Sequence, residues 1–143
     1  MIIEKYPKML REYGRAFAHI NAVELLLTKI ITEKSQILDR VADELFLGMT
    51  LGKKIDIANK LKLVDKTIVK HLRELNKRRT LLAHGVTSIT LQYSKTVKDQ
   101  VYISHKKHKE PLKKEFLSET TKNAKEVFGK LFDELCKFLD KPN

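Results

Sequence analysis

Apolar residues recur at steps of three and four positions along residues 8–33, and this periodicity is what most constrains the fold. The residues of the stripe are Leu10, Tyr13, Phe17, Ile20, Leu27 and Ile31. Such spacing places them on one face of an α-helix, with charged side chains on the opposite face. The chain contains only 5 Gly and 3 Pro, the residues that most often interrupt helices and strands. We therefore expect long regular elements, beginning with an amphipathic helix over residues 8–33.

Four further helices are predicted from similar spacing and from capping residues. They are expected at about 38–47, 51–62, 65–85 and 118–140. Thr50 and Asp65 are suitable N-cap residues for two of them, and glycines stand at the ends of two others. The β-branched, alternating segments 86–93 and 101–104 predict a β-hairpin within a basic connector at about 86–114. The expected fold class is mainly all-α, with about five helices and one β-hairpin inserted before the C-terminal helix.

Length and composition limit the class of protein. The chain of 143 residues fits one domain over residues 1–143, and its 42% of hydrophobic residues can form a buried core. No apolar run approaches the roughly 18 residues that span a bilayer, and the N-terminus lacks the residue order of a signal peptide. The single cysteine, Cys136, excludes a disulfide framework and a cysteine-rich zinc site. We therefore expect a cytoplasmic protein with no membrane segment.

Charge and apolar surface indicate two kinds of partner. The 29 Lys and Arg outnumber the 18 Asp and Glu, a formal net charge of +11, and basic residues cluster at 70–79 and 105–114. Such clusters attract phosphates by releasing counterions, although lysine-rich surfaces also serve solubility alone. The first and last helices carry wider apolar stripes than one shallow core needs. We therefore expect a nucleic-acid partner and a homodimer.

The common catalytic and metal-binding motifs are absent from the sequence. There is no Walker-type phosphate loop, no Gly-x-Ser-x-Gly elbow and no His-Glu-x-x-His helix. His105 and His108 lie three residues apart without a third ligand nearby, so a solvated basic loop is the preferred interpretation of this pair. We expect neither a metal nor another cofactor.

One pair of residues has the chemistry to cleave a phosphodiester. Arg79 and His84 lie five positions apart at the end of the fourth predicted helix, where the helix dipole favours a protonated imidazole. Arginine can stabilise the doubly charged phosphorane, and histidine can move the proton of the attacking or leaving oxygen. No metal is required when the nucleophile is the 2′-OH of the RNA. The alternative is structural, with His84 capping helix carbonyls and Arg79 solvated.

The residues around this pair resemble the HEPN superfamily of small helical domains. Its hallmark, Arg-polar-x-x-x-His, often with Leu-Ala-His-Gly at the end, corresponds here to Arg79, Thr80 and residues 82–85. The family usually has Asn or Asp at the position of Thr80. The segments 17–24 and 49–55 are also similar to the first helix and the Leu-Gly segment of such proteins. The resemblance therefore covers about residues 8–85, and the predicted helix at 118–140 resembles the family only in a generic way.

The resemblance implies a fold, an activity and a site. The fold would be an up-down bundle that dimerises so that two motifs face one cleft, and many members are metal-independent ribonucleases of toxin–antitoxin or defence systems. Arg79 would stabilise the phosphate and His84 would be the general acid/base. The auxiliary residues would be Glu24, Asn21 and Thr80, with Glu24 or Asn21 orienting the pair; alternatively, Glu24 pairs with a nearby lysine. The residues expected to follow the RNA backbone are Arg73, Arg78, Lys106, Lys107 and Lys109.

The same resemblance leaves other partners and functions open. An antitoxin or regulatory protein would be a further partner, but Val86 stands where some toxins have the Tyr that a nucleotidyltransferase modifies. The first alternative to a ribonuclease is a non-catalytic regulatory module similar to the mannitol-operon repressor-like proteins. The second alternative is a structural or assembly protein that uses its helix faces alone.

Overall fold

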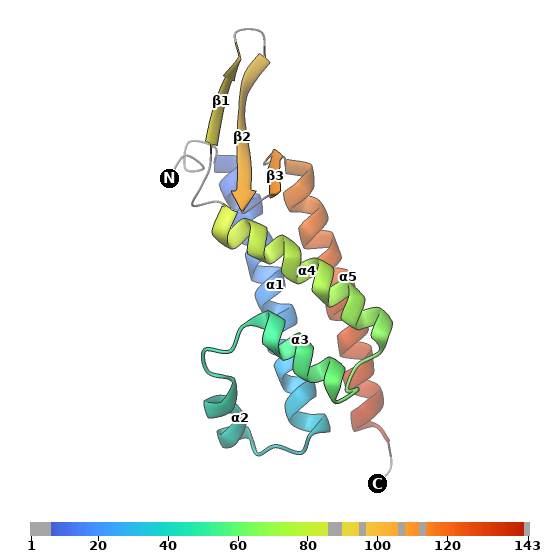
Figure 1. The fold of residues 1–143 in the computed structure, drawn as a ribbon. Coiled ribbons are helices and arrows are strands. Elements are labelled where there is room, and N and C mark those ends of the chain that lie inside the picture. Colours follow the sequence, from blue (N-terminus) through green and yellow to red (C-terminus); the bar gives the residue numbers. More distant parts are fainter. Residues whose placement is uncertain (1–6, 86–89, 95–96, 106–107, 112–113, 142–143) are drawn as a thin grey trace.

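A computed structural model describes the backbone of residues 7–85, 90–94, 97–105, 108–111 and 114–141, and the side chains of residues 7–83 and 115–141. Within these residues the chain forms five helices (Figure 1). They are α1 (Pro7–Lys34), α2 (Asp39–Phe46), α3 (Leu51–Lys60), α4 (Lys66–Gly85) and α5 (Lys114–Leu139). The prediction of a mainly helical domain with five helices is therefore confirmed.

The long helices α1 and α5 pack side by side, and α4 crosses both of them (Figure 1). The predicted stripe of α1 is buried in its second half, at Ile20, Leu27 and Ile31. Tyr13 and Phe17 are only partly buried, and Leu10, at 39% exposed, lies outside the core. The buried apolar residues of α1 are Ala16, Ile20, Val23, Leu27, Ile30 and Ile31. All of them except Ala16 belong to the main core, to which α2, α3, α4 and α5 each contribute.

A second, smaller core cluster lies beside the C-terminal end of α4. Its buried members are Ala16 of α1, Leu82 of α4 and Leu117 of α5, one from each of the three crossing helices. Partly buried aromatic residues surround them, among them Tyr13 and Phe17 of α1. The end of α4 that carries the Arg-x-x-x-x-His motif is therefore held in place by this small cluster.

The helix ends follow the predicted capping chemistry. Thr50 is the N-cap of α3, and its Oγ1 accepts a hydrogen bond of 3.3 Å from the backbone N–H of Lys53. Asp65 precedes α4, and its Oδ1 accepts from the backbone N–H of Thr67 at 3.2 Å. Gly48, after the end of α2, has a φ of +73°, a left-handed conformation that glycine adopts at no steric cost.

Three short strands separate α4 from α5 and form an antiparallel sheet in the order β1-β2-β3. They are β1 (Thr90–Ser94), β2 (Val97–His105) and β3 (His108–Pro111). Strands were predicted at 86–93 and 101–104. Residues 90–93 and 101–104 lie in β1 and β2, and residues 86–89 lie outside the described ones. β2 begins earlier than expected, since Val97 pairs with Ser94 and Gln100 with Gln92.

The basic connector also differs from its prediction. Residues 108–111 were expected in a loop but form β3, in which Glu110 pairs with Ile103 and Pro111 with Tyr102 of β2. Because β3 is an edge strand, Pro111 can occupy it without breaking a ladder on both sides. The last helix was expected from Ser118 but begins at Lys114. Its extra turn is explained by the packing of Phe116 and Leu117 into the second cluster.

Lys34, at the C-terminal end of α1, joins three parts of the chain at the pole opposite the sheet. Its Nζ donates a hydrogen bond of 2.6 Å to the carbonyl of Leu63, just before α4. The same atom lies 3.6 Å from Oε2 of Glu134 and 5.7 Å from the ring centre of Phe138, both on α5. Oε1 of Glu134 in turn accepts from the backbone N–H of Asp65 at 3.2 Å. This contact fixes where α4 starts relative to α1 and α5.

We expect Lys34→Met to lower the free energy of unfolding by about 1–3 kcal/mol, because methionine keeps the aliphatic packing but leaves the Leu63 carbonyl and Glu134 without their cation. The matched control is Lys29→Met on the same helix, whose exposed ion pair with Glu33 (2.8 Å) is expected to contribute nothing measurable. Urea unfolding followed by circular dichroism measures both. Equal stability of the two variants would contradict the role assigned to Lys34.

Candidate functional site

The candidate site is the C-terminal end of α4, where the motif residues occupy different positions around the helix. Arg79 follows Leu75 by four residues and precedes Leu82 by three, so it lies in the core-facing stripe of α4. Both leucines are almost fully buried, whereas Arg79 is half-buried. Five residues correspond to about 140° of rotation, which places the His84 backbone on the side of the helix that bears Thr80 and Lys77. His84 lies in the last turn of α4, and its side chain is outside the described ones.

Arg79 has a buried donor with no partner among the described residues. Its Nε is buried and makes no hydrogen bond there. A buried, unpaired donor costs about 1–3 kcal/mol, and for a charged group more, so native structures rarely keep one without a reason. Arg79 therefore differs from the other two arginines of α4, Arg73 and Arg78, which have carboxylate partners.

Tyr13 connects α1 to the last turns of α4. Its hydroxyl donates a hydrogen bond of 3.3 Å to the carbonyl of Leu82, and its ring centre lies 4.8 Å from that of Phe17. Burial raises the pKa of the Tyr13 hydroxyl above its ordinary value. The hydroxyl of Tyr13 therefore stays protonated, and able to donate, to a higher pH than an ordinary tyrosine hydroxyl. Tyr13 was not among the site residues expected from sequence, because its position in the apolar stripe of α1 indicated only a core role.

Arg78 joins α4 to the first turns of α5 through three contacts. Its NH1 donates to Oγ1 of Thr120 at 3.0 Å, and its NH2 lies 3.3 Å from Oε1 of Glu119. The guanidinium carbon also lies 4.9 Å from the ring centre of Phe116. Arg73 instead pairs with Asp56 of α3 at 3.0 Å, with both side chains about half exposed. Both arginines were expected to follow an RNA backbone, and the structure places each of them in an ion pair between helices.

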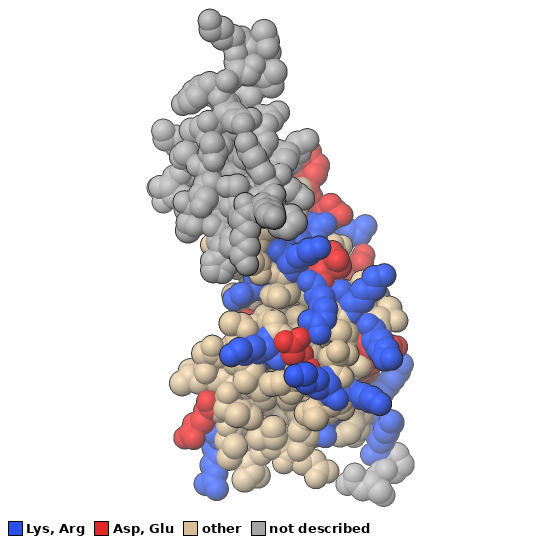
Figure 2. All heavy atoms as spheres, viewed as in Figure 1, with Lys and Arg blue, Asp and Glu red and all other residues tan. Residues whose placement is uncertain are grey.

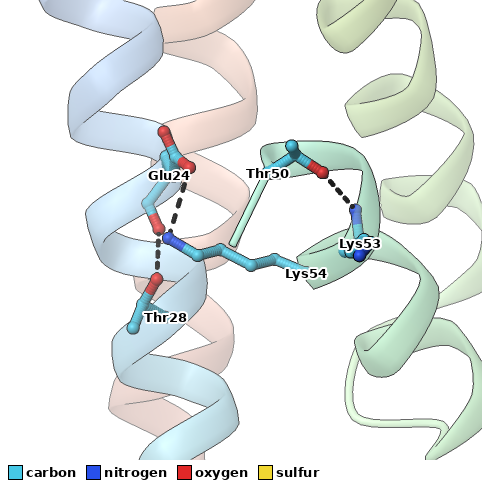
Figure 3. A network of polar contacts seen from close by, with 5 residues as sticks. All are labelled: Glu24, Thr28, Thr50, Lys53 and Lys54. Carbon is cyan, nitrogen blue, oxygen red and sulfur yellow. Dashed lines mark hydrogen bonds and ion pairs between the residues drawn. The ribbon is translucent and has the colours of Figure 1, made fainter. Parts of the chain in front are cut away.

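Glu24 lies in an ion pair that joins α1 to α3 (Figure 3). Its Oε1 is 3.2 Å from Nζ of Lys54, which is only 8% exposed, and its backbone carbonyl accepts from Oγ1 of Thr28 at 3.0 Å. Of the two interpretations that the sequence left open for Glu24, the structure shows the pair with a lysine. Asn21, one turn earlier in α1, is exposed.

The approach of α3 to α4 depends on a glycine of the Leu-Gly segment. A Cβ added to Gly52 would lie 3.3 Å from Nδ2 of Asn76 on α4, so the Asn76 side chain would have to move by a few tenths of an ångström to admit it. The segment was singled out only through its resemblance to HEPN proteins. In the structure, the segment places Lys54 in contact with Glu24 of α1 and Gly52 next to Asn76 of α4.

The remaining expected residues are Thr80 and three lysines of the basic connector. Thr80 is half-buried on α4. Lys109 is on β3, and its side chain is outside the described ones. Lys106 and Lys107 lie outside the described residues altogether.

The described residues contain neither a candidate metal cluster nor a helix that could cross a membrane. No three His, Cys, Asp or Glu side chains come together there in a group that could hold a metal ion. None of the described helices is both long enough and apolar enough to cross a membrane. No protein-family profile, curated protein or solved structure matches the chain.

We expect the Glu24–Lys54 pair to stabilise the fold. Lys54→Met is expected to lower the free energy of unfolding by about 2–4 kcal/mol, because it leaves Glu24 partly buried without its cation. The double variant Glu24→Gln/Lys54→Met should recover part of this loss, since no charge is then left unpaired. The control is the double-mutant cycle at the exposed Asp56–Arg73 pair, for which the coupling free energy is expected to be below about 1 kcal/mol. Similar coupling in both cycles, measured by urea unfolding, would contradict the assignment.

Proposed function

We propose that this protein is a metal-independent endoribonuclease of the HEPN type, in which Arg79 stabilises the phosphate and His84 is the general acid/base. The observation that carries the proposal is the buried Nε of Arg79, which has no partner among the described residues. Arg79 lies between the buried Leu75 and Leu82 along α4, and a guanidinium there with a donor unpaired among the described residues has capacity left to bind an anion.

The proposed reaction uses the substrate's own nucleophile. The 2′-oxygen of the RNA attacks the adjacent phosphorus and loses its proton, while the bond from phosphorus to the 5′-oxygen breaks. Imidazole can accept the first proton or supply the proton that the leaving oxygen gains. Arg79 would offset the charge that develops on the non-bridging oxygens. The products are a 2′,3′-cyclic phosphate and a free 5′-hydroxyl.

The position of the sheet supports an RNA-binding role for the basic connector. β2 packs against α4, and in Figure 1 the sheet lies at the C-terminal end of that helix. Lys106, Lys107 and Lys109 belong to this connector by sequence. We propose that they contact the RNA backbone next to the Arg79–His84 end of α4.

Exposed apolar and small residues of α1 support the homodimer. Leu25 is 73% exposed, and the same side of α1 carries the exposed residues Gly14, Ala18 and Asn21. A Cβ added to Gly14 would meet nothing within 4 Å, so this face is open to a second chain. We propose that α1 pairs with α1 of a second copy, which would place Asn21 in the interface.

The first experiment incubates the purified protein with a labelled structured RNA in EDTA. We expect cleavage that ends in a 2′,3′-cyclic or 3′-phosphate, and a loss of about 10²-fold or more in rate for His84→Ala and for Arg79→Ala. His71→Ala and Arg40→Ala are the matched controls, since both residues lie outside the motif and outside the proposed α1 interface, and they should cleave normally. Electrophoresis of the products and identification of their ends measure the outcome.

Two results would contradict the assignment. Cleavage by His84→Ala at the wild-type rate would indicate a contaminating nuclease. Intact RNA with wild type and variants alike folded and bound would favour the regulatory module instead.

We expect Leu25→Glu to dissociate the homodimer, because the introduced carboxylate would be buried against apolar surface of the second copy. Phe132→Glu is the control, since Phe132 is also exposed (50%) but lies on α5. Sedimentation equilibrium should give twice the 16.6 kDa chain mass for wild type and for the control, and the chain mass for Leu25→Glu. Dissociation by Phe132→Glu alone would place the interface on α5.

A further inference from the structure

The exposed face of α4 carries a row of cations that the proposed reaction does not use. The row consists of Lys66, Lys70, Arg73 and Lys77, at steps of four, three and four residues. All four are exposed. With a rise of 1.5 Å per residue, the row is about 16 Å long. Steps of three and four keep these side chains on one side of the helix.

Little negative charge accompanies this row. Glu74 is the one acidic residue within α4, and Asp56 of α3 is already paired with Arg73. No described carboxylate lies within 4 Å of the amino groups of Lys66, Lys70 or Lys77. Figure 2 shows this excess of positive charge: lysine and arginine side chains gather over the part of the surface that α4 and its neighbours form.

The neighbouring helix α3 extends the basic face. Lys53 and Lys60 are exposed on α3 and flank Asp56, the residue that joins this helix to Arg73. The two lysines are separated by seven residues, or two helical turns. The cations therefore form a band on two packed helices, and the band follows the axis of α4.

The row continues in register toward the motif. Lys77, Thr80 and His84 follow one another at steps of three and four residues, so the backbone of His84 lies on the same side of α4 as the cations. From Lys66 to His84 the distance along the helix axis is about 27 Å. An extended polyanion bound along the row is thus directed to the last turn of α4.

We infer, on the basis of the function proposed above, that the Lys66–Lys77 row is a track for the phosphate backbone of the RNA substrate, which lies along α4 with its scissile phosphate at the Arg79–His84 end. Three of the four cations are lysines, point charges without the planar, bidentate geometry that reads a base edge, and the one arginine, Arg73, is already paired with Asp56. The track therefore binds RNA regardless of sequence, and it requires a strand that extends well beyond the phosphate that is cut.

The test measures binding of the full chain to a fluorescent RNA dodecamer whose 2′-O-methyl groups prevent cleavage. Fluorescence anisotropy is recorded over a range of KCl concentrations. Lys70→Gln/Lys77→Gln removes two cations of the row. Lys122→Gln/Lys125→Gln removes two exposed cations from another part of the surface, on α5, and is the matched control. Thermal unfolding should show that all variants remain folded.

We expect the α4 variant to bind about tenfold more weakly, with a slope of log K against log salt that is smaller by about 1.4, the value for two lost phosphate contacts on a single strand. The loss should be the same for RNAs of different sequence, and a tetranucleotide should bind both proteins with similar, weak affinity. The control variant should change neither the affinity nor the slope.

An equal loss of RNA affinity in the two variants, or an unchanged slope of log K against log salt, would contradict the phosphate track even if Arg79 and His84 cleave RNA. If the wild-type protein cuts no RNA but the α4 variant alone loses RNA affinity, the phosphate track is supported and the ribonuclease is rejected. Competition by polyglutamate as effective as by unlabelled RNA would overturn the track in favour of an acidic protein partner.

Discussion

The packing of α1 against α5 is the contact on which the other elements depend. Between Ala16 and Ile31, α1 buries six apolar side chains almost completely, and replacing one such leucine or isoleucine with alanine typically costs about 2–5 kcal/mol. Because α4 crosses both helices, its own buried face is fixed by the same surface. The position of Arg79 follows from this constraint, since it occupies the turn between Leu75 and Leu82 in a helix that cannot rotate without exposing both.

The helices could be predicted because local chemistry determines where they begin and end. Features that depend on contacts between residues distant in the sequence could not be predicted. Thr50 and Gly48 mark helix ends through properties of their own backbone and side chain, so sequence was sufficient to place them. The start of α5 was misplaced because Phe116 and Leu117 pack against α1 and α4, which no local pattern reveals. β3 was missed because its edge position tolerates Pro111 and needs no alternation of apolar residues.

The same distinction applies to the candidate site. The Arg79–His84 spacing and its place at the end of α4 could be predicted from sequence, because both residues lie in one helix. The partners of Glu24, Arg73 and Arg78 could not, because each pairs with a residue of another helix, as Glu24 does with Lys54 thirty positions away. Charge counts treat all such cations alike. Only the structure separates those held in ion pairs from those that face solvent on α4.

The division of the core into two clusters has a consequence for motion. Among the described side chains, the motif end of α4 buries Leu82 beside Ala16 and Leu117, whereas the first three turns of the helix bury four residues in the larger cluster. Local opening requires the least free energy where the fewest apolar contacts are lost. Opening of the last turns of α4 therefore loses fewer of these contacts than opening of the first three turns. A site on such an end can admit a bulky polymer without disturbing the fold that carries it.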